Sequence, residues 1–115
     1  MDVNKVIDVI DNITFIEEEN TKGISMVYFN YDEISWYGAK TFANGFRALE
    51  YKDWRLPTVD EMKYLIEKSY MKKYGKGGWV WCDEYCEDIA YNIHIIRGLV
   101  DEDIKSMQLY VMLVR

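Results

Sequence analysis

A sharp structural boundary lies in Asp53-Trp54-Arg55-Leu56-Pro57-Thr58, followed at once by Val59-Asp60-Glu61. Pro57 is the only proline in the chain. It biases the residue before it toward an extended backbone and is tolerated at the start of a helix, not inside one. Thr58 and Glu61 have the spacing of a capping box, in which each side chain accepts a hydrogen bond from the other's backbone amide. The stretch therefore predicts an extended segment that leads into a helix from about Thr58 to about Tyr70.

Three side chains of this stretch are assigned structural roles. Trp54 is predicted to be a core anchor, because large aromatic side chains are usually mostly buried. Arg55 is predicted to be paired within the fold, with Asp53 or with a backbone carbonyl. Met62, Leu65 and Ile66 lie at helical spacing and are expected to form the buried face of the helix.

A second helix is predicted upstream, beginning after Ser35. Its apolar side chains recur at helical spacing: Trp36, Ala39, Ala43 and Phe46. Gly38 and Gly45 each lower the intrinsic helix propensity by about 1 kcal/mol relative to alanine. We therefore expect this helix to depend on packing for its stability and Trp36 to be buried.

The remaining apolar segments predict strands at 24–29, 79–81, 89–96 and 108–115. The last of these is a nearly continuous apolar run, which is typical of a central strand covered on both faces. Segment 3–16 fits one or two edge strands less securely, and 17–19 is expected to be a solvated hairpin tip. Segment 98–106, which contains Asp101, Glu102 and Asp103, is expected to be an exposed connection. No βαβ alternation appears, so the order predicts an α+β domain with an antiparallel sheet.

Length and charge narrow the possible classes of protein. At 115 residues and 50% hydrophobic content, the chain is predicted to be a single domain over residues 1–115. Its net charge of −6 argues against nucleic-acid binding. The lysines that cluster locally are expected to solvate a helix end: Lys68, Lys72, Lys73 and Lys76. Every apolar segment is shorter than the ~20 residues of a membrane span. No signal peptide is apparent, so a cytoplasmic location is expected unless the chain is a processed form or a fragment.

Four features together resemble the Lcl C-terminal-like domain family. They are Ser35-Trp36 at the start of an alanine-containing helix, segment 53–58 with Glu61 and Leu65, Trp79-Val80-Trp81, and the ending Leu113-Val114-Arg115. The similarity runs from about Asp11 to Arg115. This family, long described as a domain of unknown function, is similar to the formylglycine-generating (sulfatase-modifying factor) domains and more distantly to C-type lectins. The resemblance implies a C-type-lectin-like α+β fold, with two helices packed on a twisted antiparallel β-sheet and a long irregular loop region.

The sequence departs from these relatives where their ligands bind. The calcium site of C-type lectins uses a Glu-Pro-Asn or Gln-Pro-Asp tripeptide, whereas the only proline here is Pro57. That site is therefore not expected. Carboxylates at Asp101-Glu102-Asp103 suit a hard cation, but a solvated acidic turn is the simpler interpretation. We predict no metal site and no cofactor.

The two cysteines and the single histidine do not predict catalysis. Cys82 and Cys86 are four residues apart, which is not a CxxC motif, and they do not match the catalytic pair of the formylglycine-generating enzymes. Free thiols, a disulfide and a soft-metal site with His94 as third ligand all remain open. His94 lies in an alternating apolar segment, where a structural or exposed histidine is more common than a general base. No catalytic residue is predicted.

A noncatalytic recognition module, binding carbohydrate or a protein partner, is the leading hypothesis, because loops on a rigid core commonly carry recognition. The predicted ligand-binding residues are Trp79, Trp81, Asp83, Glu84 and Tyr85. They combine aromatic faces with carboxylates, although either tryptophan could instead pack in the core. Two alternatives remain: a structural or assembly component of a phage or cell-surface appendage, which would form a homo-oligomer, and an enzyme similar to sulfatase-modifying factors.

Overall fold

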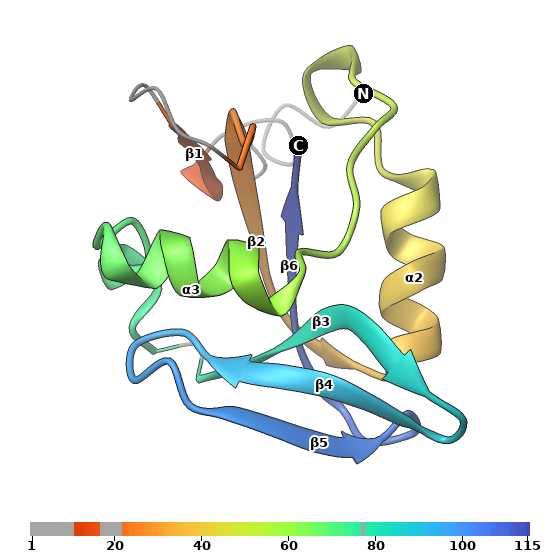
Figure 1. Cartoon of the computed structure of the whole chain (residues 1–115). Coiled ribbons are helices and arrows are strands. Elements are labelled where there is room, and N and C mark those ends of the chain that lie inside the picture. The colour runs from red at the N-terminus through yellow and green to blue at the C-terminus, as the bar shows by residue number, and fades with distance from the viewer. Residues whose placement is uncertain (1–10, 17–21, 77) are drawn as a thin grey trace.

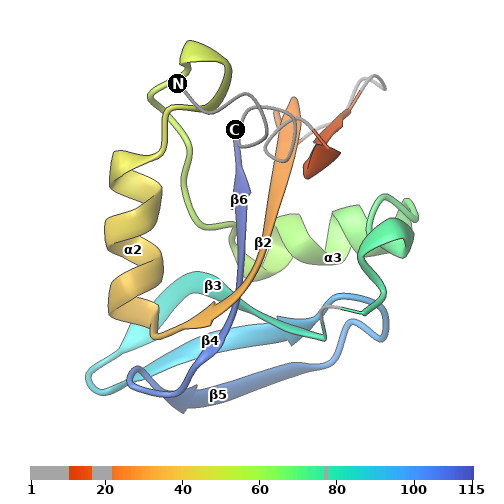
Figure 2. The ribbon, with the colours of Figure 1, turned by 180° about the vertical axis from the view of Figure 1, so that it is seen from behind.

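The chain forms a six-stranded sheet that carries an α-helix on each face (Figures 1 and 2). The computed structural model describes residues 11–16, 22–76 and 78–115. The strands lie in the order β1-β2-β6-β3-β4-β5. Their bounds are β1 (Ile13–Phe15), β2 (Met26–Ile34), β3 (Trp79–Cys86), β4 (Ile89–His94), β5 (Val100–Ile104) and β6 (Leu109–Val114). The helices are α2 (Trp36–Gly45) and α3 (Val59–Glu67), with short 3₁₀ turns η1 (Ala48–Glu50) and η2 (Lys72–Tyr74). The α+β prediction is thus confirmed.

The sheet is mixed, and the prediction of an antiparallel sheet is wrong at one pair of strands. β2 and β6 are antiparallel, as are β3 with β4 and β4 with β5. β3 and β6, however, run parallel and are joined through one residue pair, Val80 with Tyr110. In Figure 1 the β1-β2-β6 half crosses the β3-β4-β5 half steeply. Among the described residues, β3 and β6 therefore pair only at this short junction, which no feature of the sequence indicates.

The two helices bury different faces of the sheet. On one face Met62 and Leu65 of α3 belong to a cluster with Met112. On the other face Trp36, Ala39 and Ala43 of α2 pack in a cluster that contains Val111, Leu113 and Trp81. β6 sends alternate side chains to the two clusters, which confirms that it is a central strand covered on both faces. Among the described residues, no helix is long and apolar enough to cross a membrane.

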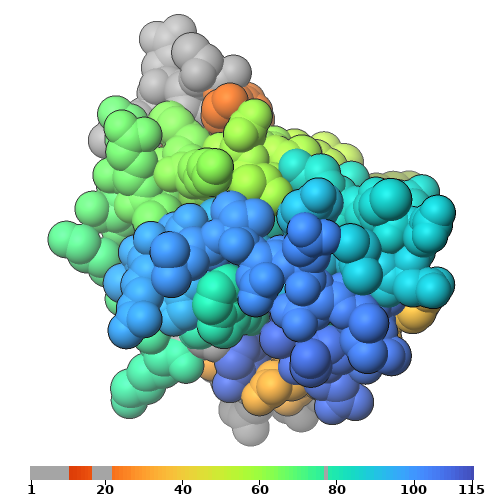
Figure 3. Space-filling model, turned by 60° about the horizontal axis from the view of Figure 1, so that its bottom comes forward, coloured from red at the N-terminus to blue at the C-terminus, as the bar shows by residue number. Residues whose placement is uncertain are grey.

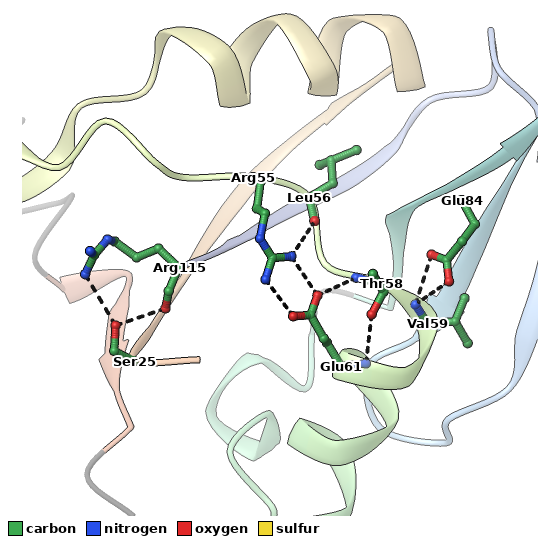
Figure 4. Close-up of polar contacts among 8 residues, drawn as sticks. All are labelled: Ser25, Arg55, Leu56, Thr58, Val59, Glu61, Glu84 and Arg115. Atoms are coloured by element: carbon green, nitrogen blue, oxygen red, sulfur yellow. Dashed lines mark hydrogen bonds and ion pairs between the residues drawn. The ribbon is translucent and has the colours of Figure 1, made fainter. Parts of the chain in front are cut away.

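The predicted helix start is confirmed atom by atom (Figure 4). Thr58 Oγ1 accepts a hydrogen bond from the Glu61 amide at 3.1 Å, and Glu61 Oε1 accepts one from the Thr58 amide at 2.8 Å. Before the helix, the backbone of Arg55 pairs with Val114 of β6 in both directions, at 3.1 and 2.8 Å. The predicted extended segment is therefore attached to the central strand, and Trp54 is buried as expected.

Arg55 is paired within the fold as predicted, and one of its contacts is to a backbone carbonyl, but its main partner is Glu61 and not Asp53. Its guanidinium binds both carboxylate oxygens of Glu61, at 2.7 and 2.6 Å, while a weaker contact to the Leu56 carbonyl measures 3.4 Å. Asp53 instead pairs with Arg115, at 2.6 Å between Oδ1 and Nε. Glu61 is the closer partner in space, because the turn at Pro57 folds the first turn of α3 back over Arg55.

The structure also corrects the prediction for segment 101–103 and describes only part of segment 3–16. Segment 101–103, expected to be an exposed turn, is the middle of β5. Asp101 and Glu102 are exposed, whereas Asp103 is half-buried and accepts from Asn92 Nδ2 at 2.9 Å. A strand with three consecutive carboxylates shows no hydrophobic alternation, so the sequence pattern does not predict it. In segment 3–16 only Ile13–Phe15 is a described edge strand, while residues 3–10 and the predicted tip at 17–19 lie outside the described residues.

Glu61→Gln should isolate the contribution of the ion pair, because glutamine can still complete a capping box. Burial alone would raise the pKa of Glu61, but the Arg55 and Thr58 hydrogen bonds outweigh it and hold the pKa below its usual value of 4.5. A lowered carboxylate pKa stabilises the fold above the unfolded-state pKa, and that stability is lost as the pH falls through the folded-state pKa. We expect the variant to lose about 1–3 kcal/mol of unfolding free energy at neutral pH, measured by urea denaturation.

The deficit should begin to shrink as the pH falls below about 4.5, where Glu61 of the unfolded chain is protonated, and should continue to shrink through the lower pKa of Glu61 in the folded chain. Asp60→Asn is the matched control, because Asp60 is exposed in the same helical turn. It should cost less than about 1 kcal/mol. A Glu61→Gln deficit that stays constant from neutral to acidic pH would contradict the assigned role of the pair.

Candidate functional site

The two predicted ligand-binding tryptophans are part of the packing. Trp81 is completely buried, and its indole Nε1 donates to the Ile34 carbonyl at 2.9 Å. Trp79 is half-buried and lies edge-on to His94, with ring centroids 5.4 Å apart. Ligand contact by Trp81 does not fit this burial, and its role is that of a core residue.

The outer half of β3 departs from regular pairing and sends its side chains in two directions. Its register with β4 shifts between Trp81 and Tyr85, where the Asp83 amide donates instead to the Pro57 carbonyl at 2.8 Å. A bulge of this kind bends a strand and re-aims its side chains. As a result, the predicted residues Asp83, Glu84 and Tyr85 do not form one cluster.

Glu84 turns toward α3. Both of its carboxylate oxygens accept from the Val59 amide, at 3.0 and 3.1 Å, so it adds a second carboxylate at the start of the helix (Figure 4). This placement is favourable, because the free amides and the dipole make a helix N-terminus positive. Glu84 also borders an open groove of about 310 Å³, lined by Val59, Lys63, Glu84, Tyr91 and Val100. Within that groove the carboxylate is already used for capping.

Asp83 and Tyr85 turn toward α2, where a second cluster forms. Asp83 Oδ1 accepts from Lys40 Nζ at 2.7 Å. The Tyr85 ring lies 5.0 Å from the Trp36 ring, whose Nε1 donates to the Cys82 carbonyl at 3.0 Å. These contacts fasten the outer half of β3 to the first turns of α2.

Lys105 completes this cluster from the turn after β5. Its Nζ lies 4.2 Å from the ring centroid of Tyr85, 4.7 Å from that of Trp36 and 5.7 Å from that of Tyr37. Both backbone polar groups of Lys105 are hydrogen-bonded. Its carbonyl accepts from the Trp36 amide at 2.9 Å, and its amide donates to the Asp88 carbonyl at 2.8 Å. We call the exposed face that results the Lys105 surface; it comprises Tyr37, Lys40, Asp83, Tyr85 and Lys105 over the buried Trp36. Figure 3 shows the cyan of β3 beside the blue of the C-terminal third of the chain.

Exposure within the Lys105 surface is uneven. Lys105 is only 7% exposed, whereas the two tyrosines at its edge, Tyr37 and Tyr85, are 55% and 60% exposed. A lysine over aromatic faces is attracted by their ring quadrupoles, by about 0.5–1 kcal/mol at exposed sites and more when water is excluded. The lysine therefore holds the rings in place while their outer parts remain open to a ligand.

Sequence reasoning found Asp83 and Tyr85 but missed their partners. Lys105 lies in the segment expected to be a solvated connection, and Tyr37 follows a tryptophan that was considered only for burial. A signal existed at Tyr37, because the residue after a buried helical position points away from the core. No comparable signal marked Lys105, since its neighbours come from distant parts of the chain.

Other reactive groups have ordinary structural surroundings. His94 Nδ1 accepts from the amides of Ile96 and Arg97, at 3.3 and 3.2 Å, which makes it a structural histidine. Cys82 is buried and Cys86 is exposed, and neither forms a disulfide. In the part of the chain that the structure describes, no three histidine, cysteine, aspartate or glutamate side chains are grouped to hold a metal ion. Comparison with protein-family models and with curated proteins finds no match for the chain.

The two thiols should differ sharply in reactivity toward a disulfide reagent such as Ellman's. Burial, with a contribution from Glu84 and Asp83, raises the pKa of Cys82 far above that of a free thiol, and the thiolate is the reactive form. Only Cys86 is accessible, so the native protein should release one equivalent of chromophore rapidly. The second equivalent should appear only after unfolding.

Cys86→Ser is the control and should abolish the rapid reaction without affecting the slow one. Two rapidly reacting thiols would contradict the burial of Cys82. A native protein without any reactive thiol, whose reactivity returns after reduction, would instead indicate a disulfide.

Proposed function

We propose that the chain is a noncatalytic recognition module and that it binds a protein partner through the Lys105 surface. The observation that carries this proposal is the pair of exposed tyrosines, Tyr37 and Tyr85, whose rings are held from below by Trp36 and Lys105. A restrained aromatic ring offers a large contact area at a low cost in conformational entropy.

The surroundings of the tyrosines favour a protein over other ligands. Met107, two residues beyond Lys105 in the chain, is 43% exposed. Tyrosine, tryptophan and methionine are enriched at protein interfaces relative to the rest of the surface. An aromatic face with a flexible aliphatic neighbour therefore suits the mixed side chains of a polypeptide.

Carbohydrate is the second candidate, and one contact favours it. The Lys40–Asp83 ion pair is partly exposed, with 40% and 44% of the side chains accessible. It offers a donor and an acceptor beside the tyrosine rings, an arrangement that suits adjacent sugar hydroxyls over an aromatic face.

At the level of the fold, we propose a relationship to the Lcl C-terminal-like and C-type-lectin-like group. Support comes from the tryptophan-led helix α2 and from the Arg-Leu-Pro-Thr turn before α3, which occur in the expected order. A recognition role in such a group would place ligand contacts on segments outside the regular core, and Lys105 lies on such a segment, the turn after β5.

The binding proposal can be tested by selecting a displayed random-peptide library on the folded chain, with a glycan array probed in parallel. Trp81→Ala is unsuitable as a variant, because emptying so large a buried site costs about 3–5 kcal/mol of stability. Tyr37→Ala and Tyr85→Ala remove exposed rings instead. Selected peptides should bind each variant at least about tenfold more weakly than the wild type, as expected for loss of an aromatic anchor.

Leu99→Ala is the matched control, because Leu99 is 52% exposed and precedes β5, at the end opposite Lys105. It should leave the affinity unchanged. Ligands that come only from the glycan array and depend on both tyrosines would favour the carbohydrate candidate. If neither screen yields a ligand, or if ligands bind the tyrosine variants as well as the wild type, the proposal fails.

A further inference from the structure

The ammonium group of Lys105 has an unusual environment. The residue is 7% exposed, its Nζ lies over the rings of Trp36, Tyr37 and Tyr85, and no hydrogen bond or ion pair joins that Nζ to another described residue. Every fully buried side-chain nitrogen or oxygen of the described residues has a hydrogen-bond partner, so the Lys105 Nζ, which has none, must reach solvent at its tip while the rest of the side chain is covered. Ring faces attract the cation but do not accept its N–H groups as a carboxylate would.

Lys40 provides an internal comparison within the same surface. Its Nζ also lies over Trp36, at 5.6 Å from the ring centroid, yet it has a carboxylate partner in Asp83 at 2.7 Å. Of the two ammonium groups beside Trp36, one therefore has a carboxylate partner among the described residues and the other has none. The Lys105 surface retains a local positive charge.

The position of Lys105 beside the N-terminus of α2 adds to that positive charge. Its carbonyl accepts from Trp36, the first residue of the helix, so Lys105 lies at the N-terminal end. This end carries the positive pole of the helix dipole, and the first turn contains no acidic residue to offset it. Serine, not a carboxylate, caps the helix, through Ser35 Oγ and the Gly38 amide.

From these observations we infer that the partner is an acidic peptide segment whose Asp or Glu carboxylate pairs with Lys105 between Tyr37 and Tyr85. The inference rests on the proposed function and specifies its ligand. The partner would supply what the fold lacks, a carboxylate acceptor for the ammonium, while its neighbouring apolar side chain packs on the tyrosine rings. Charged hydrogen bonds with water excluded are among the stronger polar contacts in interfaces.

Long-range attraction cannot produce the same preference. The chain carries a net charge of −6, so its overall field repels acidic peptides. A preference for acidic over neutral peptides would therefore report a local site. Added salt screens the general repulsion more than a close, desolvated contact, so high salt should not abolish the preference.

The test uses peptides selected on the whole folded chain, resynthesised in pairs that differ only by Asp→Asn or Glu→Gln. Fluorescence anisotropy then gives their affinities for the wild type and for Lys105→Met, which keeps an unbranched side chain but removes the charge. We expect the amide peptide to bind the wild type at least about tenfold more weakly than the acidic one. Lys105→Met should bind both peptides equally and weakly.

Two further variants separate the charge effect from a folding defect. Lys105→Arg keeps a cation and should retain most of the preference for the acidic peptide. Lys63→Met removes an exposed lysine in the α3 groove and should behave like the wild type. Circular dichroism must show the same fold for all three variants.

Failure of the inference is distinguishable from failure of the proposed function. Peptides that depend on Tyr37 and Tyr85 but bind equally as acid and amide would overturn the carboxylate site and leave the protein-binding surface standing. The same holds if Lys105→Met keeps the acid preference. If no peptide binds, or if only acidic glycans bind in a Lys105-dependent way, the acidic-peptide inference is overturned together with the protein-partner proposal.

Discussion

The Glu61 carboxylate joins two parts of the chain that the rest of the structure depends on. It accepts the Thr58 amide and the Arg55 guanidinium together, so the start of α3 and the extended segment before it are fixed in one geometry. That geometry leaves the Pro57 carbonyl and the Val59 amide pointing toward β3, where they bind the Asp83 amide and the Glu84 carboxylate. The turn thereby holds the bulged half of β3, and this half carries Tyr85 toward α2.

Two other exposed parts of the molecule are less suited to the proposed recognition role than the Lys105 surface. The α3 groove beside Glu84 has its carboxylate occupied by helix capping. Backbone groups at the outer edge of β5 are also already hydrogen-bonded. The Glu102 amide donates to the Asp101 side chain at 2.8 Å, and the Ile104 carbonyl accepts from the Met107 amide at 3.0 Å. Addition of a partner strand there would have to break these bonds. The Lys105 surface, by contrast, combines exposed rings with a cation that has no carboxylate partner in the part of the chain that the structure describes.

Local sequence rules predicted the parts of the fold that local chemistry determines. The capping box at Thr58 and Glu61, the buried stripe of α2 and the central position of β6 follow from spacing and apolarity alone. The parallel contact of β3 with β6 and the strand identity of the acidic segment 101–103 do not, because both depend on which distant segment lies alongside.

The candidate site was only half predictable for the same reason. Asp83 and Tyr85 were predicted from residue type, whereas Lys105 reaches them from a segment about 20 residues away in sequence by a path that the sheet topology sets. Trp81 was the opposite case. Its residue type suited a ligand site as well as a core, and only the position of α2 over β3 decides that it is buried.

The Lys105 ammonium lies among the rings of Trp36, Tyr37 and Tyr85, and this position can be measured without any ligand. The proton chemical shift of the Lys105 ε-methylene group reports ring currents directly. We predict a resonance displaced clearly upfield of an exposed lysine, with cross-peaks to Tyr85, that moves back partway in Tyr85→Leu. A Lys105 resonance at the position of the exposed lysines, without cross-peaks to the rings, would contradict this position of the ammonium group and the proposal that the Lys105 surface binds a partner.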